Sequence, residues 1–179
     1  MPFQAHPLFY NGNYYIRPME SVNIRVLQTA DDPIIANIVR TTLTEFGMNK
    51  PGTAYADPAT DHLSTLFDKP RAIYYVAEID GQVIGGAGIH PLDGGPGEIC
   101  ELQKMYLLPE ARGKGLAGKL ITLCLQFAKE QGYTHCYLET SPELARARKV
   151  YEQFGFEYLS GPMGNTGHFG CDNWMLKAL

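Results

Sequence analysis

The sequence predicts a single α+β domain with a mixed β-sheet and helices on both of its faces. The chain has 179 residues, of which 45% are hydrophobic and 19% are charged, as expected for one compact globular domain. Its middle holds consecutive strand-like runs joined by tight turns, which indicate antiparallel strands. Its second half alternates strands with amphipathic helices, which indicates crossover connections.

The first third of the chain predicts an arm, one strand and two helices. Residues 1–18 are rich in aromatic residues, Pro and Asn without a regular period, so we expect an irregular arm before a domain spanning 19–179. Asn23 to Leu27 alternates like a strand. Asp31-Asp32-Pro33 then supplies a cap and a first-turn proline for a helix that ends at Gly47. Its broad apolar face carries Ile34, Ile35, Ile38, Val39, Leu43 and Phe46.

The next segment predicts a loop, a short helix and a hairpin. Met48 to Ala59 contains two prolines and a glycine and reads as a loop, leading into a short helix around His62 to Phe67. Ala72 to Glu78 and Val83 to His90 are β-rich runs. They are separated by Asp80-Gly81, a dipeptide typical of tight hairpin turns.

The rest of the chain predicts strands alternating with helices. Ile99 to Leu107 is a long strand, and 113–115 opens a helix with apolar residues at helical spacing. Cys136 to Thr140 is a strand, and Ser141-Pro142-Glu143 begins another helix that Gly155 ends. The last two strands are expected at Phe156 to Leu159 and about Asp172 to Leu176. The stripes of the two helices are Leu116, Leu120, Leu123 and Phe127, and Leu144, Ala147, Tyr151 and Phe154.

Charge and hydropathy exclude several classes of partner. The formal net charge is −4, so no basic field favours nucleic acid or an anionic membrane, and only Arg146 to Lys149 is a dense basic stretch. No apolar run approaches the roughly 18 residues of a spanning helix, and the N-terminus lacks the pattern of a signal peptide. We therefore expect a cytoplasmic protein without membrane or nucleic-acid partners.

The four cysteines indicate core thiols rather than a disulfide framework or a metal centre. Cys100, Cys124, Cys136 and Cys171 form no C-x-x-C pair, which favours reduced thiols in a cytosolic protein. His168 and Cys171 have H-x-x-C spacing, but no second pair completes a zinc site. We expect no metal.

A glycine-rich turn between a strand and a helix is the strongest signal of a binding site. After Leu107 a proline stops the strand, and Gly113 and Gly115 expose backbone N–H groups at the start of a helix. Such a terminus carries partial positive charge and suits a pyrophosphate, to which Arg112 and Lys114 add charge, although such a loop can also merely turn the chain. Gly113 to Lys119 also has the G-x-x-x-x-G-K spacing of a nucleotide-binding P-loop. The next residue, however, is leucine, where that site needs a hydroxyl for magnesium.

The same turn and its surroundings resemble the GNAT superfamily of N-acetyltransferases. Arg112-x-x-Gly115-x-Ala117 matches that family's R/Q-x-x-G-x-G/A signature. The supporting context is Glu101 to Tyr106 before it, Tyr137 to Thr140 on the next strand, and Ala147-x-x-Val150-Tyr151-x-x-x-Gly155-Phe156 downstream. The resemblance extends from about Ile24 to the C-terminus. It departs at Leu144, where many members have an asparagine, which puts a side-chain bond to pantetheine in doubt.

The resemblance implies a mixed sheet of about seven strands and acetyl-CoA as co-substrate. The co-substrate is expected between two splayed parallel strands that end near Leu107 and Thr140, with its pantetheine paired to the first of them like an extra strand. A backbone N–H near Met105 would polarise the thioester carbonyl. The residues expected to bind it are Met105, Tyr106, Leu107, Arg112, Gly113, Lys114, Gly115, Leu116, Ala117 and Ala147.

The resemblance also suggests catalytic residues. Tyr151 takes the place of the family's tyrosine acid and would protonate the departing thiolate, unless it is only a core residue. Glu101 is our choice for the base that accepts the amine's proton. Glu98 and Glu139 are its rivals, and in a regular strand Glu98 and Glu101 would face opposite ways. His90 and His168 are further candidates for lining the acceptor pocket.

The predicted function is acetyl transfer from acetyl-CoA to a small primary amine by direct attack. A non-catalytic acyl-CoA sensor and a P-loop-like nucleotide-binding protein are the alternatives. The sequence leaves open which amine is used and whether the chain forms a homodimer.

Overall fold

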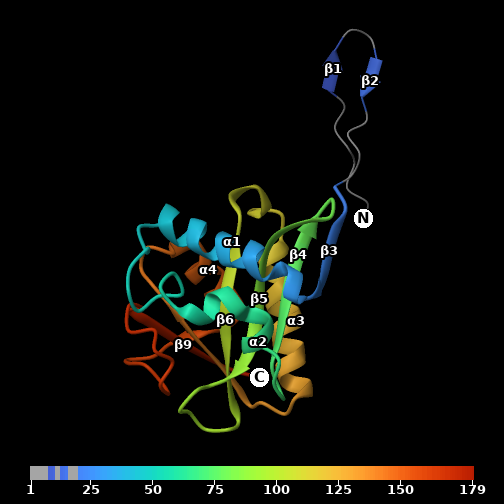
Figure 1. Ribbon diagram of the computed structural model, residues 1–179. Coiled ribbons are helices and arrows are strands. Elements are labelled where there is room, and N and C mark those ends of the chain that lie inside the picture. Colours follow the sequence, from blue (N-terminus) through green and yellow to red (C-terminus); the bar gives the residue numbers. More distant parts are fainter. Residues whose placement is uncertain (1–7, 11–12, 16–19) are drawn as a thin grey trace.

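The computed structural model describes residues 8–10, 13–15 and 20–179 (Figure 1). Within these residues, seven strands form one sheet in the order β3-β4-β5-β6-β7-β9-β8. Its strands are β3 (Val22–Val26), β4 (Ile73–Ile79), β5 (Gln82–Pro91), β6 (Ile99–Leu107), β7 (His135–Thr140), β8 (Glu157–Tyr158) and β9 (Asn173–Ala178). All neighbours are antiparallel except β6 and β7, which are parallel. The predicted mixed sheet is confirmed.

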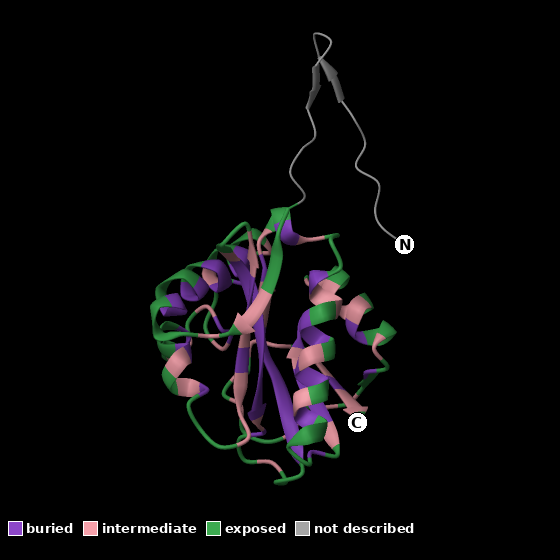
Figure 2. Cartoon of the chain, turned by 90° about the vertical axis from the view of Figure 1, so that its right-hand side faces the viewer, coloured by how far each residue is buried: buried purple, intermediate pink, exposed green. Residues whose placement is uncertain are grey.

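Helices cover both faces of this sheet, as predicted (Figures 1 and 2). The helices are α1 (Asp32–Glu45), α2 (Leu63–Leu66), α3 (Leu116–Glu130) and α4 (Ala145–Gln153). Short 3-10 turns precede the first three of these helices, at η1 (Thr29–Asp31), η2 (Pro58–His62) and η3 (Pro109–Ala111). α1 and α2 pack on one face, and α3 and α4 contribute to the core on the other. In Figure 2 the sheet between them is mostly buried.

Burial on both faces explains the composition of the central strands. On β4, Tyr74 and Val76 belong to the α1 side of the core, whereas Ala77 belongs to the α3 side. The neighbouring strand β5 makes room for the Tyr74 ring with Gly86 and Gly88, where a Cβ atom would lie 2.4 and 2.6 Å from that ring. This close packing brings the Tyr74 hydroxyl to β6, where it donates a hydrogen bond to a backbone carbonyl described below.

Most predicted elements begin and end within two residues of the observed bounds. The Asp80-Gly81 turn is confirmed, because both residues have positive φ, 51° and 78°. Ile34 was wrongly placed on the buried face of α1, since it is 45% exposed. α4 begins at Ala145 rather than at 141, because the Leu144 N–H donates to the Ser141 carbonyl at 3.0 Å and closes a separate turn first.

The N-terminal arm differs in part from the irregular segment expected at 1–18. Two short strands, β1 (Leu8–Tyr10) and β2 (Asn13–Tyr15), pair antiparallel with each other. In the sequence they flank Asn11-Gly12, a dipeptide that is typical of hairpin turns. The rest of the expected arm lies outside the described residues. No helix of the described part of the chain is long and apolar enough to span a membrane.

Candidate active site

The parallel strands β6 and β7 separate toward their carboxyl ends. They pair only at their beginnings, where Ile99, Cys100 and Glu101 face residues 135–137. Beyond Glu101, β6 continues to Leu107 and β7 to Thr140 without pairing to each other. The predicted splayed pair is therefore present, and the edge of β6 beyond Glu101 is free on this side.

A β-bulge at Lys104 interrupts the pairing of β6 with β5 in the same part of the strand. From the pair Gly88–Gln103 to the pair Gly86–Tyr106, β5 advances by two residues and β6 by three. The extra residue is accommodated by Lys104, whose φ of 50° lies in the left-handed region. Its carbonyl accepts the Tyr74 hydroxyl bond at 2.8 Å.

The Lys104 side chain anchors the bulge to the loop before α2. Its Nζ atom donates to Asp57 Oδ2 at 2.5 Å and to Thr60 Oγ1 at 3.2 Å, and the side chain is only 1% exposed. The Asp57 carboxylate also accepts from the Ala59 N–H and so caps η2. A partly buried ion pair thus holds the irregular part of β6 against the loop before α2.

An open cleft of about 550 Å³ lies along the free part of β6. It is bounded by the end of β6, the glycine-rich turn, the start of α3 and α4. Nine of the ten residues predicted to bind the co-substrate line it: Met105, Tyr106, Leu107, Arg112, Gly113, Gly115, Leu116, Ala117 and Ala147. The tenth, Lys114, does not line the cleft, and its ammonium group pairs with the Glu20 carboxylate.

The glycine-rich turn presents backbone N–H groups to the cleft. Gly113 and Gly115 both have φ of 75°, a conformation that favours glycine. Among the described residues, no backbone hydrogen bond leads from the N–H groups of 113–118 to an acceptor outside the helix. Because the first N–H groups of a helix have no acceptor within it, this end of α3 suits an anion.

Arg112 braces the turn rather than projecting freely into the cleft. Its two terminal nitrogens each lie 2.7 Å from a carboxylate oxygen of Glu45 at the end of α1. Its Nε atom donates to the Leu107 carbonyl at 3.0 Å. Arg146, on α4, lines the cleft as well.

The P-loop alternative fails at its metal-binding position. Leu120 follows the G-x-x-x-x-G-K spacing and is fully buried in the core that α3 forms with the sheet. A buried leucine side chain has no atom that could coordinate magnesium beside a nucleotide.

Tyr151 is a packed residue that also lines the cleft. Its ring contacts Phe156 edge-on, with centroids 6.0 Å apart, and the residue is 7% exposed. Tyr151 also lines the cleft. Burial raises the pKa of Tyr151 above its ordinary value, so the phenol keeps its proton. The core and acid roles considered for this residue are compatible.

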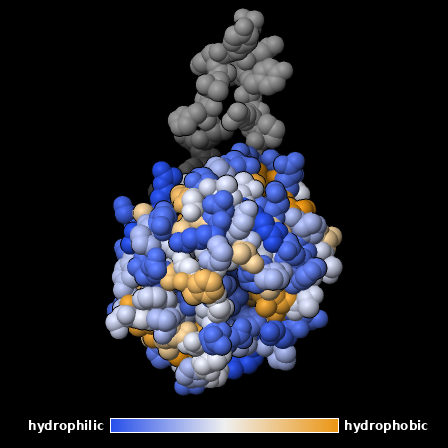
Figure 3. Space-filling model, turned by 60° about the vertical axis from the view of Figure 1, so that its left-hand side comes forward, coloured by the Kyte–Doolittle hydropathy of each residue, from blue (hydrophilic) through white to orange (hydrophobic). Residues whose placement is uncertain are grey.

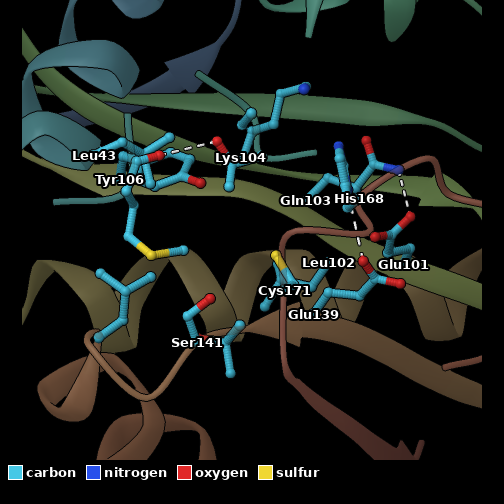
Figure 4. A pocket seen from close by; sticks show the side chains of 15 residues that line it. Leu43, Glu101, Leu102, Gln103, Lys104, Tyr106, Glu139, Ser141, His168 and Cys171 are labelled. Atoms are coloured by element: carbon cyan, nitrogen blue, oxygen red, sulfur yellow. Dashed lines mark hydrogen bonds and ion pairs between the residues drawn. The ribbon is translucent and has the colours of Figure 1, made fainter. Parts of the chain in front are cut away.

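A second, smaller cavity of about 40 Å³ adjoins the cleft on the other side of the bulge (Figure 4). Its polar lining includes Glu101, Gln103, Glu139, His168 and Cys171. Six residues line both cavities: Leu102, Lys104, Tyr106, Glu139, Thr140 and Leu144. The two cavities therefore meet where β6 and β7 part.

Glu101 is the buried carboxyl group of this polar pocket. It is 1% exposed, and its Oε2 atom accepts a bond from Gln103 Nε2 at 2.5 Å. Burial raises the pKa of Glu101 to about 7. Such a group is poised to exchange a proton near neutral pH.

The other predicted candidates separate into two groups. Glu98 is exposed in the turn before β6, and His90 packs against Phe67; neither lines either of these two cavities. Glu139 and His168 do line the polar pocket. Glu139 Oε1 accepts from the hydroxyls of Tyr137 and Thr166, whereas its buried Oε2 has no bond among the described residues.

Asp57 and Lys104 were not predicted from the sequence. Asp57 Oδ2 lies 3.7 Å from His168 Nε2, and His168 together with Lys104 holds the pKa of Asp57 well below its usual range. The sequence signal at Asp57 is that of a cap before Pro58, which this residue also is. Nothing in the local pattern of β6 marks Lys104 as a bulge.

The cysteines require one correction. Cys100, Cys124 and Cys136 are free and buried, as predicted, but Cys171 is half-buried and lines the polar pocket. Burial raises the pKa of Cys171 to about 12, so its thiol is a weak nucleophile.

Three side chains of the pocket have the donor types of a metal site. One ligand atom from each of Glu101, Glu139 and His168 lies within 4.8 Å of the others. The H-x-x-C pair considered above is not this set, because Cys171 is not part of it. The expectation of a metal-free enzyme stays a prediction.

Comparison with known proteins agrees with this geometry. A family model described as Acetyltransferase (GNAT) family matches residues 37–156. An Escherichia coli K12 protein named uncharacterized N-acetyltransferase YjgM is 44% identical over 165 residues, covering 92% of this chain and 98% of its own. Human N-acetyltransferase 8B is 33% identical over 119 residues, covering 63% of this chain and 52% of its own.

Solved structures share the fold. The PaiA N-acetyltransferase of Thermoplasma acidophilum, in complex with coenzyme A, superposes with a TM-score of 0.67 at 18% identity, covering 89% of this chain and 99% of its own. A phosphinothricin acetyltransferase of Sinorhizobium meliloti, in complex with AcCoA, gives 0.68 at 21% identity and covers 88% of both chains. From the family match, the E. coli relative and the shared fold together, we conclude that the chain belongs to the GNAT family of acetyltransferases.

Proposed function

We propose that this enzyme transfers the acetyl group of acetyl-CoA to the primary amine of a small molecule by direct attack in a ternary complex. The observation that carries the proposal is the meeting of two cavities at the bulge of β6, with six lining residues in common. One cavity is open and presents helix N–H groups, and the other is small and holds buried carboxyl groups. Two substrates bound in them would meet at the bulge.

The open cleft fits the chemistry of coenzyme A. The N–H groups of 113–118 suit the pyrophosphate, and the free edge of β6 offers backbone groups to the amides of pantetheine. Leu144 replaces the asparagine common in the family, so the side chain at this position contributes only apolar contact. Relatives named N-acetyltransferase and fold neighbours that hold coenzyme A or AcCoA support the same assignment.

Glu101 is the proposed base. An amine that enters the polar pocket as an ammonium ion must lose a proton before it can attack. The carboxylate of Glu101 can accept that proton, and a pKa of about 7 matches the task near neutral pH. Activity should therefore rise as pH increases through about 7.

Tyr151 is the proposed acid. Tyr151 lines the cleft, and burial raises the pKa of its phenol, so the phenol keeps its proton. A phenol in this position donates a hydrogen bond or a proton to the departing thiolate.

The small size of the polar pocket favours a compact acceptor.

An amine panel tests the proposal. Purified enzyme is incubated with acetyl-CoA and single amines at several pH values, and both free thiol and N-acetylated product are measured. We expect equal amounts of both with at least one small primary amine. Tight binding of coenzyme A without thiol release from any amine would favour the sensor alternative.

Thermal unfolding tests the ligand class independently. Coenzyme A at about 100 times its Kd should add about 2.7 kcal/mol to the free energy of unfolding. ATP with magnesium should protect much less, and the opposite order would contradict the assignment of the cleft.

We also infer a cytoplasmic location from the four free cysteines.

A further inference from the structure

A base as deeply buried as Glu101 needs a route by which its proton reaches solvent. Its side chain is 1% exposed, and its hydrogen bond in the pocket comes from Gln103, whose amide cannot carry a proton onward. Unless the proton leaves, Glu101 stays neutral after one turnover and cannot accept the next proton. This argument rests on the proposed function, in which Glu101 is the base.

Exposure increases along a row of three side chains that begins at Glu101. His168 and Asp57 have side chains that are 15% and 25% exposed, against 1% for Glu101. Figure 4 shows the His168 ring beside Glu101 and Glu139 in the pocket. A ring nitrogen of His168 and carboxylate oxygens of Glu101 and Glu139 lie within 4.8 Å of one another.

The two nitrogens of the His168 ring face different carboxylates. Nδ1 lies 3.9 Å from Glu139 Oε2 inside the pocket, and Nε2 lies 3.7 Å from Asp57 Oδ2 toward the surface. Both separations are within ion-pair distance and a few tenths of an ångström longer than a direct hydrogen bond. An imidazole with acceptors on both sides can take up a proton at one nitrogen and release one from the other.

The backbone that carries the ring is tied to the same pocket. The backbone N–H of His168 donates to Thr166 Oγ1 at 3.2 Å, and the Thr166 hydroxyl donates to Glu139 Oε1 at 2.9 Å. Asp57 is itself held by Lys104 and by its cap on η2. The titratable groups that face the ring are therefore Asp57, Glu101 and Glu139, with Lys104 behind Asp57.

We propose that His168 carries the proton from Glu101 toward solvent past Asp57. The protonated carboxyl of Glu101 gives its proton to the nitrogen on the pocket side of the neutral ring. The ring releases the proton of Nε2 toward the Asp57 side and solvent. Glu101 is left as a carboxylate, and the ring returns to its starting state by exchanging its proton from one nitrogen to the other.

Chemical rescue by imidazole tests this role. His168→Ala removes the carrier and leaves a recess that imidazole can enter. We expect kcat to fall by about 10-fold or more, within the range of acid–base assistance, while the KM for acetyl-CoA stays unchanged. Added imidazole should restore a large part of kcat, and more so at pH values where imidazole is neutral. His62→Ala, at an exposed histidine of η2, is the matched control and should show neither loss nor rescue.

Several results would overturn the proposal. A His168→Ala enzyme with a kcat close to that of the wild type has no need of the carrier. A loss of kcat that imidazole does not restore, in a variant with an unchanged KM for acetyl-CoA, would leave His168 a purely structural role. If His168→Ala does not fold, His168→Gln replaces it and should lose kcat without a change in the KM for acetyl-CoA; retained kcat would overturn the proposal. A wild-type enzyme that acetylates no amine would instead reject the proposed function.

Discussion

At the scale of single residues, Glu101 links the stability of the protein to its chemistry. Its pKa rises from 4.5 to about 7 on folding because the carboxyl group is buried. The folded chain therefore binds a proton that the unfolded chain releases between these values. The free energy of unfolding falls as pH rises through this window.

Glu101→Gln should remove this pH dependence. The full difference between the two pKa values corresponds to roughly 3 kcal/mol. We expect the variant to gain stability relative to the wild type as pH rises from about 5 to about 8, while its rate falls most where the amine is protonated. Urea unfolding at a series of pH values measures the first effect. Glu98→Gln, at an exposed position, is the control. A stability difference between Glu101→Gln and the wild type that does not change with pH would contradict the burial cost assigned to Glu101.

Tyr151→Phe separates the acid role from packing. The ring would still contact Phe156, so thermal stability and the KM for acetyl-CoA should change little. Turnover should fall by about 10²-fold or more. Tyr75→Phe, a partly buried tyrosine on β4 that lines neither cavity, is the matched control. If Tyr151→Phe keeps full turnover in an assay not limited by product release, the hydroxyl is not the acid.

The residues of the polar pocket were only partly predictable from the sequence. Glu101, Tyr151 and the cleft residues were found because they lie in or beside motifs of fixed spacing. Asp57, Lys104 and His168 come together from separate segments. His168 was a candidate for the acceptor pocket, but no local pattern predicts that Asp57 and Lys104 would lie beside it. Their proximity depends on how the loops before α2 and before β9 fold over the end of β6.

At the scale of elements, the start of α3 carries the binding of the anionic co-substrate. Gly115→Val should raise the KM for acetyl-CoA about 10-fold, equivalent to about 1.4 kcal/mol, because the side chain would distort a φ of 75° and project where the cleft is open. Gly132→Val is a close control, since Gly132 has a φ of 76° and open space at the other end of α3. Both variants should lose similar stability, and only the first should change KM. Equal KM values would remove the turn from the binding site.

The bulge of β6 depends on the partly buried pair of Lys104 and Asp57. Lys104→Met leaves the Asp57 carboxylate without its closest cation, and we expect a loss of about 3 kcal/mol in unfolding free energy. Lys114→Met breaks only an exposed pair with Glu20 and should change stability by less than about 0.5 kcal/mol. Chemical denaturation compares the two. Similar small losses would mean that the bulge does not need this pair.

The order of elements was predictable because each one carries its own signal. Turn dipeptides, glycine stops and two different hydrophobic periods mark the strands and helices in order. The start of α4 was not predictable in this way. Ser141-Pro142 has the pattern of a helix cap, but the Ser141 carbonyl accepts from the Leu144 N–H and closes a separate turn before the helix. The side chain of Ser141 instead lines the polar pocket.

At the scale of the whole molecule, the mixed sheet creates the active site. Antiparallel pairing holds β3 to β6 together, and the single parallel pair of β6 and β7 is free to part. The resulting opening lies between the N-terminal end of α3, on one face of the sheet, and the loop before α2, on the other face. The face in Figure 3 shows only small, separated apolar patches, and the homodimer considered from the sequence stays a prediction.

The central claim is that acetyl transfer occurs directly between two substrates bound in adjoining cavities. The alternative is a covalent acetyl-enzyme, for which Cys171 is a candidate nucleophile in the pocket, although its raised pKa disfavours it. Initial rates measured while both acetyl-CoA and the best amine are varied distinguish the two most directly. We predict intersecting lines in double-reciprocal plots, as for a ternary complex. Parallel lines, with an acetyl group found on Cys171 after incubation without amine, would contradict the account.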